Sequence, residues 1–152
     1  MSETFRDLKV KSPLLPPTSI VIFGGTGDLA QTKLYPALLD LFAHGALPNK
    51  FRIIGISRQE LTPEAYVEFV KASLNKKNGN YDPLVIEEFC QHIEYHDGDF
   101  GLASTYAKLL LWMKKFDDSV NQCTNKLFYL AVPPQLYSGI FKFLDESGLM
   151  RT

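Results

Sequence analysis

The chain has 152 residues, of which 45% are apolar and 22% are charged, and its formal net charge is −1. This balance predicts one globular domain and excludes an intrinsically disordered chain. The small net charge gives no field to attract nucleic acid or an acidic membrane, and no apolar run approaches the ~20 residues that span a bilayer. The amino-terminal segment lacks the pattern of a signal peptide. We therefore expect a cytoplasmic protein with neither a nucleic acid nor a membrane as partner.

The cysteines and histidines give no support for a disulfide or for metal chemistry. Cys90 and Cys123 lie far apart without a CxxC spacing, and the three histidines form no HExxH motif. We expect two buried free thiols and no metal site.

Apolar runs and helical spacings alternate along the chain. Three prolines predict that residues 1–17 form a flexible tail, so the domain should span residues 18–152. Continuous apolar runs predict buried parallel strands over 19–23, 51–57, 92–95 and 127–132. Helical spacing and start signals predict helices over 29–42 with a kink or restart at Pro36, over 63–74 after the cap Thr62, from Asp82–Pro83, over 102–116 and over 135–144.

This alternation of strands and helices indicates an α/β fold. We expect a Rossmann-type doubly wound parallel sheet in three αβα layers, incomplete at its carboxyl-terminal side. A fourth strand without an outer neighbour would leave its backbone open and would uncover Phe128 and Leu130. Such an edge predicts self-association of the chain.

The turn after the first predicted strand carries the chemistry. Residues 25–30 read Gly-Thr-Gly-Asp-Leu-Ala, a G-x-G-x-x-A fingerprint between a buried strand and a helix. We expect Gly25 to permit the tight turn, Gly27 to let a pyrophosphate approach the backbone, and Ala30 to let the helix pack on the sheet. The free N–H groups of the helix N-terminus would bind the pyrophosphate, and Asp28 would cap or orient the loop. The candidate cofactor-binding residues are Gly24, Gly25, Thr26, Gly27, Asp28, Leu29 and Ala30. A plain glycine turn is the alternative.

The end of the second predicted strand selects the cofactor. A site for NAD places Asp or Glu there, whereas a site for NADP places Arg near the 2′-phosphate. This strand ends in Ser57, Arg58 and Gln59. The guanidinium group can donate two parallel hydrogen bonds to a phosphate, and the serine hydroxyl can donate one as well. We expect NADP as the cofactor; Glu60 keeps NAD open as a weaker alternative, and Arg58 could instead be a solvated surface residue.

Four stretches together resemble the amino-terminal part of the glucose-6-phosphate dehydrogenase family. They are residues 23–30, Lys33-Leu34-Tyr35-Pro36, residues 54–58 and residues 127–134, and they occur in the family's order. The Gly-Asp-Leu-Ala run followed by Lys-Leu-Tyr-Pro is more specific than a bare glycine fingerprint. The resemblance implies an oxidoreductase of glucose metabolism in the pentose phosphate pathway. Such an enzyme oxidises glucose 6-phosphate to 6-phosphogluconolactone and transfers hydride to NADP.

The resemblance also implies roles for single residues. It places Lys33 near the sugar substrate. It extends the cofactor site to Asp97, Gly98, Ala131, Pro133 and Tyr137. A short insertion around residues 99–102 separates this chain from the family pattern next to Gly98.

The family pattern continues with motifs that this sequence does not contain. A Glu-Lys-Pro motif carries an active-site lysine, and an Asp-His motif belongs to the acid–base machinery. The resemblance therefore implies a truncated piece of a homo-oligomeric enzyme, with no catalytic residue and no activity of its own. Two alternatives stay open: a non-catalytic NADP-sensing Rossmann protein, and an unrelated dehydrogenase or sugar epimerase with the same fingerprint.

Overall fold

The computed structural model describes residues 15–77 and 81–151, so most of the expected tail over 1–17 lies outside the described residues. Its sheet holds four strands in the order β3-β2-β1-β4, and every neighbouring pair is parallel. The strands are β1 (Thr18–Phe23), β2 (Phe51–Ser57), β3 (Ile93–Asp97) and β4 (Asn125–Leu130). This order confirms the predicted α/β class with a parallel sheet of Rossmann type.

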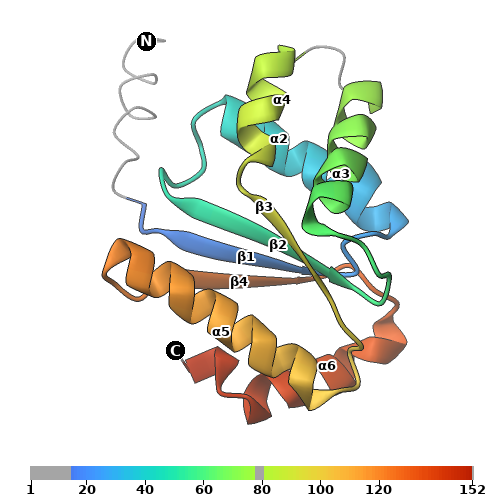
Figure 1. Cartoon of the computed structure of the whole chain (residues 1–152), viewed down its shortest axis with the longest axis vertical. Helices are drawn as coiled ribbons and strands as arrows, with labels where there is room; N and C mark the ends of the chain where they lie inside the picture. The colour runs from blue at the N-terminus through green and yellow to red at the C-terminus, as the bar shows by residue number, and fades with distance from the viewer. Residues whose placement is uncertain (1–14, 78–80, 152) are drawn as a thin grey trace.

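Helices cover both faces of the sheet, which makes the three layers that the sequence predicts. Figure 1 shows α2, α3 and α4 on one face, and α5 and α6 on the other. The helices of the first layer are α2 (Tyr35–Ala43), α3 (Pro63–Lys77) and α4 (Pro83–Cys90), and those of the second are α5 (Ala103–Val120) and α6 (Tyr137–Glu146). Short 3-10 turns span Pro134–Leu136 and Leu149–Arg151. No helix within residues 15–77 and 81–151 is both long and apolar enough to cross a membrane.

The side chains of β1 explain why its sequence is apolar without alternation. Ile20 and Ile22 are buried in the core under α2, α3 and α4, while Val21 and Phe23 are buried in the core under α5 and α6. A strand covered on both faces has no position for a polar side chain that faces water.

The helix after β1 restarts at Pro36, as predicted. A π-helical turn over Ala30–Leu34 precedes α2, and the Tyr35 N–H donates to the Ala30 carbonyl, five residues back. Pro36 occupies the first turn of α2, where a residue without an N–H costs nothing. The caps of the next helices are also as expected, because Thr62 accepts from the Ala65 N–H at 3.0 Å and Asp82 from the Leu84 N–H at 2.9 Å.

The burial of β4 differs from the expectation. Phe128 and Leu130 do not lose cover, because they pack against the core under α5 and α6. The exposed side chains belong to the other face, where Leu127 is 52% and Tyr129 39% exposed. Leu127 and Tyr129 pair with Ile20 and Ile22 of β1, so they lie on the face of the sheet that α2, α3 and α4 cover at β1. Cys123 is also exposed, so only Cys90 fits the expectation of buried thiols.

Candidate functional site

The glycine-rich turn lies at the carboxyl ends of the strands, between β1 and the helix that starts at Asp28. The N–H groups of Gly24 and Gly25 both donate to the Ile56 carbonyl, at 2.8 and 3.1 Å. The Gly24 φ of +86° is in the left-handed region, and a Cβ there would collide with the Ala131 carbonyl oxygen. Gly24 therefore supplies the backbone freedom of the turn, whereas the sequence had predicted that role for Gly25.

Gly25 is needed for space and not for its dihedral angles. A Cβ at Gly25 would lie 2.6 Å from the Tyr66 hydroxyl and 2.9 Å from the Gly55 Cα. Gly27 differs, because its Cβ would meet only the Gly24 carbonyl oxygen at 3.3 Å and the Ala131 carbonyl oxygen at 3.9 Å. Its outer side is therefore open, as the approach of a pyrophosphate requires.

The backbone of this turn presents unsatisfied donors. The N–H of Gly27 bonds the Gly24 carbonyl at 3.0 Å, and the Gln31 N–H closes the first helical turn on Gly27 at 3.1 Å. Within the described residues, the N–H groups of Thr26, Asp28 and Leu29 make no hydrogen bond. Free N–H groups at the start of a helix are a binding site for an anion.

Two other residues of the fingerprint behave differently from each other. Ala30 is fully buried, which agrees with its expected role in packing the helix on the sheet. The Asp28 side chain is exposed and makes no hydrogen bond in the part of the chain that the structure describes. Only its carbonyl has a side-chain partner, the Thr32 hydroxyl at 2.8 Å. The expected capping by the Asp28 carboxylate is therefore absent from this structure.

The end of β2 places Arg58 outward and Ser57 inward. Arg58 has a side chain that is 77% exposed, and its nearest carboxylate is that of Asp99 at 3.9 Å. The buried Ser57 hydroxyl accepts from the Gln59 N–H at 3.2 Å and lies 2.6 Å from the Tyr95 hydroxyl. Because Tyr95 donates to the Gln59 carbonyl, the proton of Ser57 goes to Tyr95. The Arg58 guanidinium is therefore open to solvent beside Asp99, while the Ser57 hydroxyl holds the turn through Gln59 and Tyr95.

A hollow of about 390 Å³ opens beside Arg58, between the loops that follow β3 and β4. Its lining consists of Arg58, Asp99, Phe100, Gly101, Gln135, Leu136, Ser138, Gly139, Ile140 and Phe143. The Gly98 N–H donates to the Ser57 carbonyl at 2.8 Å, so the loop after β3 begins directly beside the end of β2. The sequence had not singled out Asp99 or Gln135; their positions after strand ends were the available signal.

The remaining candidates lie at the surface near this edge. Lys33 is exposed on the π-helical turn and has no ion pair among the described residues. Pro133 is exposed, and Tyr137, at 36% exposure, begins α6 after the 3-10 turn. Asp97 ends β3 with an exposed side chain.

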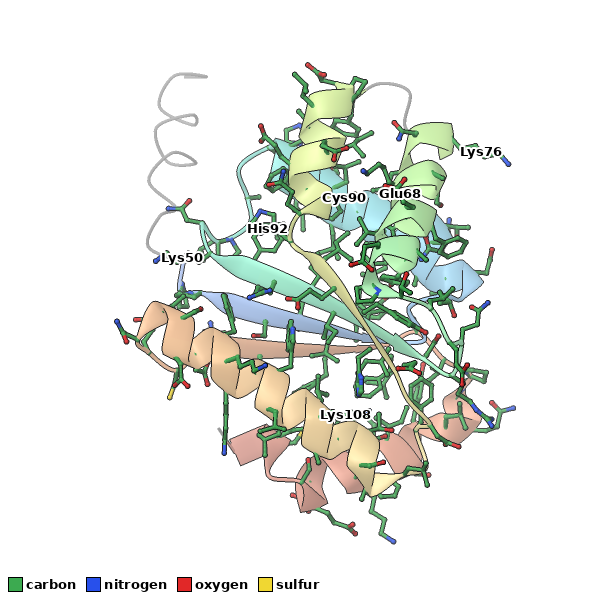
Figure 2. The ribbon with its side chains drawn as sticks, viewed as in Figure 1. Lys50, Glu68, Lys76, Cys90, His92 and Lys108 are labelled. Carbon is green, nitrogen blue, oxygen red and sulfur yellow. The ribbon has the colours of Figure 1, made fainter. Side chains whose placement is uncertain are left out.

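The buried thiol and two of the histidines have structural surroundings. Burial raises the pKa of the Cys90 thiol to about 11, so it carries no thiolate near neutral pH. His92 and His96 bond the backbone carbonyls of Phe51 and Thr105. Figure 2 shows Lys50 and His92 at the end of the sheet where β2 and β3 begin, opposite to the glycine turn. No group of three metal-ligating side chains occurs in the described ranges.

Comparison with known proteins identifies relatives over nearly the whole domain. The family model described as "Glucose-6-phosphate dehydrogenase, NAD binding domain" matches residues 21–152. The glucose-6-phosphate 1-dehydrogenase of Leuconostoc mesenteroides is 35% identical over 133 residues, which are 88% of this chain and 27% of that protein. That of Bacillus subtilis is 32% identical over 143 residues, 94% of this chain and 28% of that protein.

A solved structure described as "Glucose-6-phosphate dehydrogenase in complex with its substrate glucose-6-phosphate" superposes with a TM-score of 0.81 and 34% identity. The superposition covers 88% of this chain and 28% of that one. The chain therefore spans a little over a quarter of the length of these relatives, and it corresponds to their dinucleotide-binding part.

Proposed function

The chain belongs to the glucose-6-phosphate dehydrogenase family, as an NAD binding domain, and from this premise we propose that it holds NADP for the oxidation of glucose 6-phosphate to 6-phosphogluconolactone. The observation that carries the proposal is the family match over residues 21–152, which includes the whole glycine turn and the end of β2. The relatives described above are dehydrogenases, so the alternative of a non-catalytic NADP-sensing protein is not favoured.

The residues of the turn fit a dinucleotide. The free N–H groups of Thr26, Asp28 and Leu29 would bind the pyrophosphate, and Gly27 has the open outer side that lets it approach. Gly24 seats the turn against Ala131, while Gly25 and Ala30 allow the helix and α3 to pack close to the sheet.

The residues around the hollow fit the adenosine half of the cofactor. Arg58 would pair with the 2′-phosphate, and Ser57 with Gln59 would hold the turn that presents it. We assign Asp97 and Gly98 to the adenine side. Pro133 and Tyr137, after the end of β4, would line the path of the cofactor toward its nicotinamide end, where the bound cofactor accepts a hydride.

Lys33 is assigned to the sugar phosphate. It is exposed, it has no ion pair in the described part of the chain, and it lies in the turn that directly follows the pyrophosphate loop. An unpaired ammonium group at that position can bind a hydroxyl or a phosphate oxygen. The family resemblance extends the proposal to a cytoplasmic homo-oligomer with a domain over residues 18–152; sedimentation of the enzyme that carries the domain tests the assembly.

A domain exchange tests the proposed activity. Residues 18–152 would replace the matching segment of the Leuconostoc mesenteroides relative, and formation of NADPH would be followed with glucose 6-phosphate present. We expect sugar-dependent NADPH formation by the hybrid and none by a matched hybrid that carries Gly27→Val. Titration of NADP into the 152-residue chain, followed by calorimetry, measures binding without the rest of the enzyme. A folded hybrid without activity and a chain without affinity for NADP would together refute the proposal.

A further inference from the structure

The carbonyl oxygen of Gly25 is held by two buried side chains. The Gln31 Nε2 donates to it at 2.7 Å, and the Tyr66 hydroxyl donates to it at 2.9 Å. A third group supports this pair, because the Tyr35 hydroxyl lies 2.6 Å from that of Tyr66. Tyr35 and Tyr66 are fully buried, and Gln31 is 6% exposed. The Gly25 carbonyl therefore faces the core, toward α3, and not toward the ligand side of the turn.

The directions of these hydrogen bonds follow from the groups involved. A carbonyl only accepts, so Tyr66 uses its single proton on Gly25, and Tyr35 must donate to Tyr66. Burial raises the pKa of both phenols well above the usual value, which keeps both groups protonated as donors. Gly25 thus receives two donors at every ordinary pH.

Gly55 provides the space that this arrangement needs. Gly55 lies inside β2, and a Cβ there would overlap the Tyr66 hydroxyl. A glycine within a strand usually marks a close approach of another group, which here is the phenol of Tyr66. The ring of Tyr66 also stacks on that of Tyr95, with centroids 4.5 Å apart. Two glycines and an aromatic ring therefore fix the position of one hydroxyl.

The position of this carbonyl determines the direction of the next N–H. In a planar trans peptide the C=O and the N–H point in opposite directions, and no cis peptide occurs among the described residues. Since the Gly25 carbonyl points into the core, the Thr26 N–H points out of it. That N–H makes no hydrogen bond within the described chain, and Thr26 directly precedes Gly27, whose outer side is open.

We propose that Tyr66 and Gln31 are positioning residues of the cofactor site, which aim the Thr26 N–H at the pyrophosphate by holding the Gly25 carbonyl in the core. The inference rests on the proposed function, because it takes the ligand of the turn to be a dinucleotide. Without the two donors, the flexible Gly25–Thr26 peptide can rotate and turn its carbonyl oxygen toward the phosphates. An anion would then meet a partial negative charge where it now meets a donor.

The test removes the donors without removing the packing. Tyr66→Phe keeps the ring on Gly55, and Gln31→Met keeps the length of the side chain. Calorimetric titration of NADP and of NAD into the 152-residue chain should show affinity about fivefold lower for each single variant and at least about tenfold lower for the double variant. The affinities for NADP and for NAD should fall by the same factor, because both cofactors contain the pyrophosphate. The matched control is Tyr81→Phe, which removes a tyrosine hydroxyl bonded to Asp40 and should leave both affinities unchanged.

A spectroscopic measurement separates positioning from a loss of stability. The amide resonance of Thr26 should shift when inorganic pyrophosphate is added to the wild-type chain, and this shift should be reduced in Tyr66→Phe at a temperature where both chains are folded. A wild-type chain that binds neither NADP nor pyrophosphate would refute the proposed function. A wild-type chain that binds, together with folded Tyr66→Phe and Gln31→Met chains of equal affinity, would overturn the positioning role alone.

Discussion

Arg58 should supply most of the preference for NADP over NAD. Its guanidinium is 77% exposed and only loosely paired with Asp99 at 3.9 Å, so little has to be broken before it binds a phosphate. A hydrogen bond between charged groups contributes about 1.5–3 kcal/mol, and exposure to solvent favours the lower end of that range. Arg58→Ala should therefore weaken NADP binding by about tenfold, while the affinity for NAD, which has no 2′-phosphate, stays nearly constant.

Titration of both cofactors into the wild-type chain and the variant measures this difference directly. Arg52→Ala is a matched control, because Arg52 pairs with Glu94 near the opposite end of β2. It should leave the ratio of the two affinities unchanged. If Arg58→Ala lowers the affinity for NADP and for NAD by the same factor, Arg58 does not read the 2′-phosphate.

Four further expectations follow from the same geometry. Asp99→Asn should strengthen NADP binding by about two- to fivefold and leave NAD unchanged in the same titrations, because it removes a negative charge beside the 2′-phosphate. Gly27→Val should abolish the calorimetric signal of both cofactors, because the side chain would take the place of the pyrophosphate; the circular dichroism spectrum should stay native, because the Gly24 carbonyl oxygen, 3.3 Å from the new Cβ, has to shift by only a few tenths of an ångström. In the active hybrid enzyme, Lys33→Ala should lower kcat or raise KM for the sugar and leave the affinity for NADP unchanged. Unchanged kinetics would show that Lys33 is a solvated surface lysine that does not bind the sugar. The 152-residue chain should self-associate through the exposed face and edge of β4, and Leu127→Lys should shift its sedimentation toward the monomer.

The strands were predictable because the sheet is covered on both faces. In a chain of alternating strands and helices, a continuous apolar run such as Ile20–Phe23 indicates a strand that is buried on both faces. The predicted bounds of β2, residues 51–57, are those that the structure has. β4 was displaced by two residues, since its end at Leu130 depends on the register with β1 and not on its own composition. The fingerprint loop was found from local sequence alone, because strand, turn and helix are contiguous there.

The internal support of that loop could not be predicted in the same way. Tyr66 lies 41 residues after Gly25, and its spacing in the sequence predicts only an apolar position of an amphipathic helix. Its function depends on Gly55, a strand residue whose lack of a side chain has meaning only once α3 is packed on β2. The role of Gly24 was missed for a related reason: its constraint is the carbonyl of Ala131, the residue that follows β4, about a hundred residues away along the chain.

Under the proposed function, affinity and selectivity would depend on different parts of the site. The pyrophosphate is common to NAD and NADP, and under the proposal it would bind the N–H groups of the turn, among which that of Thr26 is aimed by the hydrogen bonds of Tyr66 and Gln31 to Gly25. The 2′-phosphate belongs to NADP alone, and the arginine assigned to it directly follows β2, next to Ser57, whose hydroxyl lies 2.6 Å from that of Tyr95. A substitution of Tyr66 or Gln31 should therefore change the affinities for NADP and NAD by the same factor, whereas a substitution of Arg58 should change the ratio of the two affinities. The ring of Tyr66 stacks on that of Tyr95, which bonds Ser57 beside Arg58, so the two groups of residues are in contact. Titration of NADP into the double variant Tyr66→Phe/Arg58→Ala measures the coupling between them as the departure of its binding free energy from the sum of the two single effects.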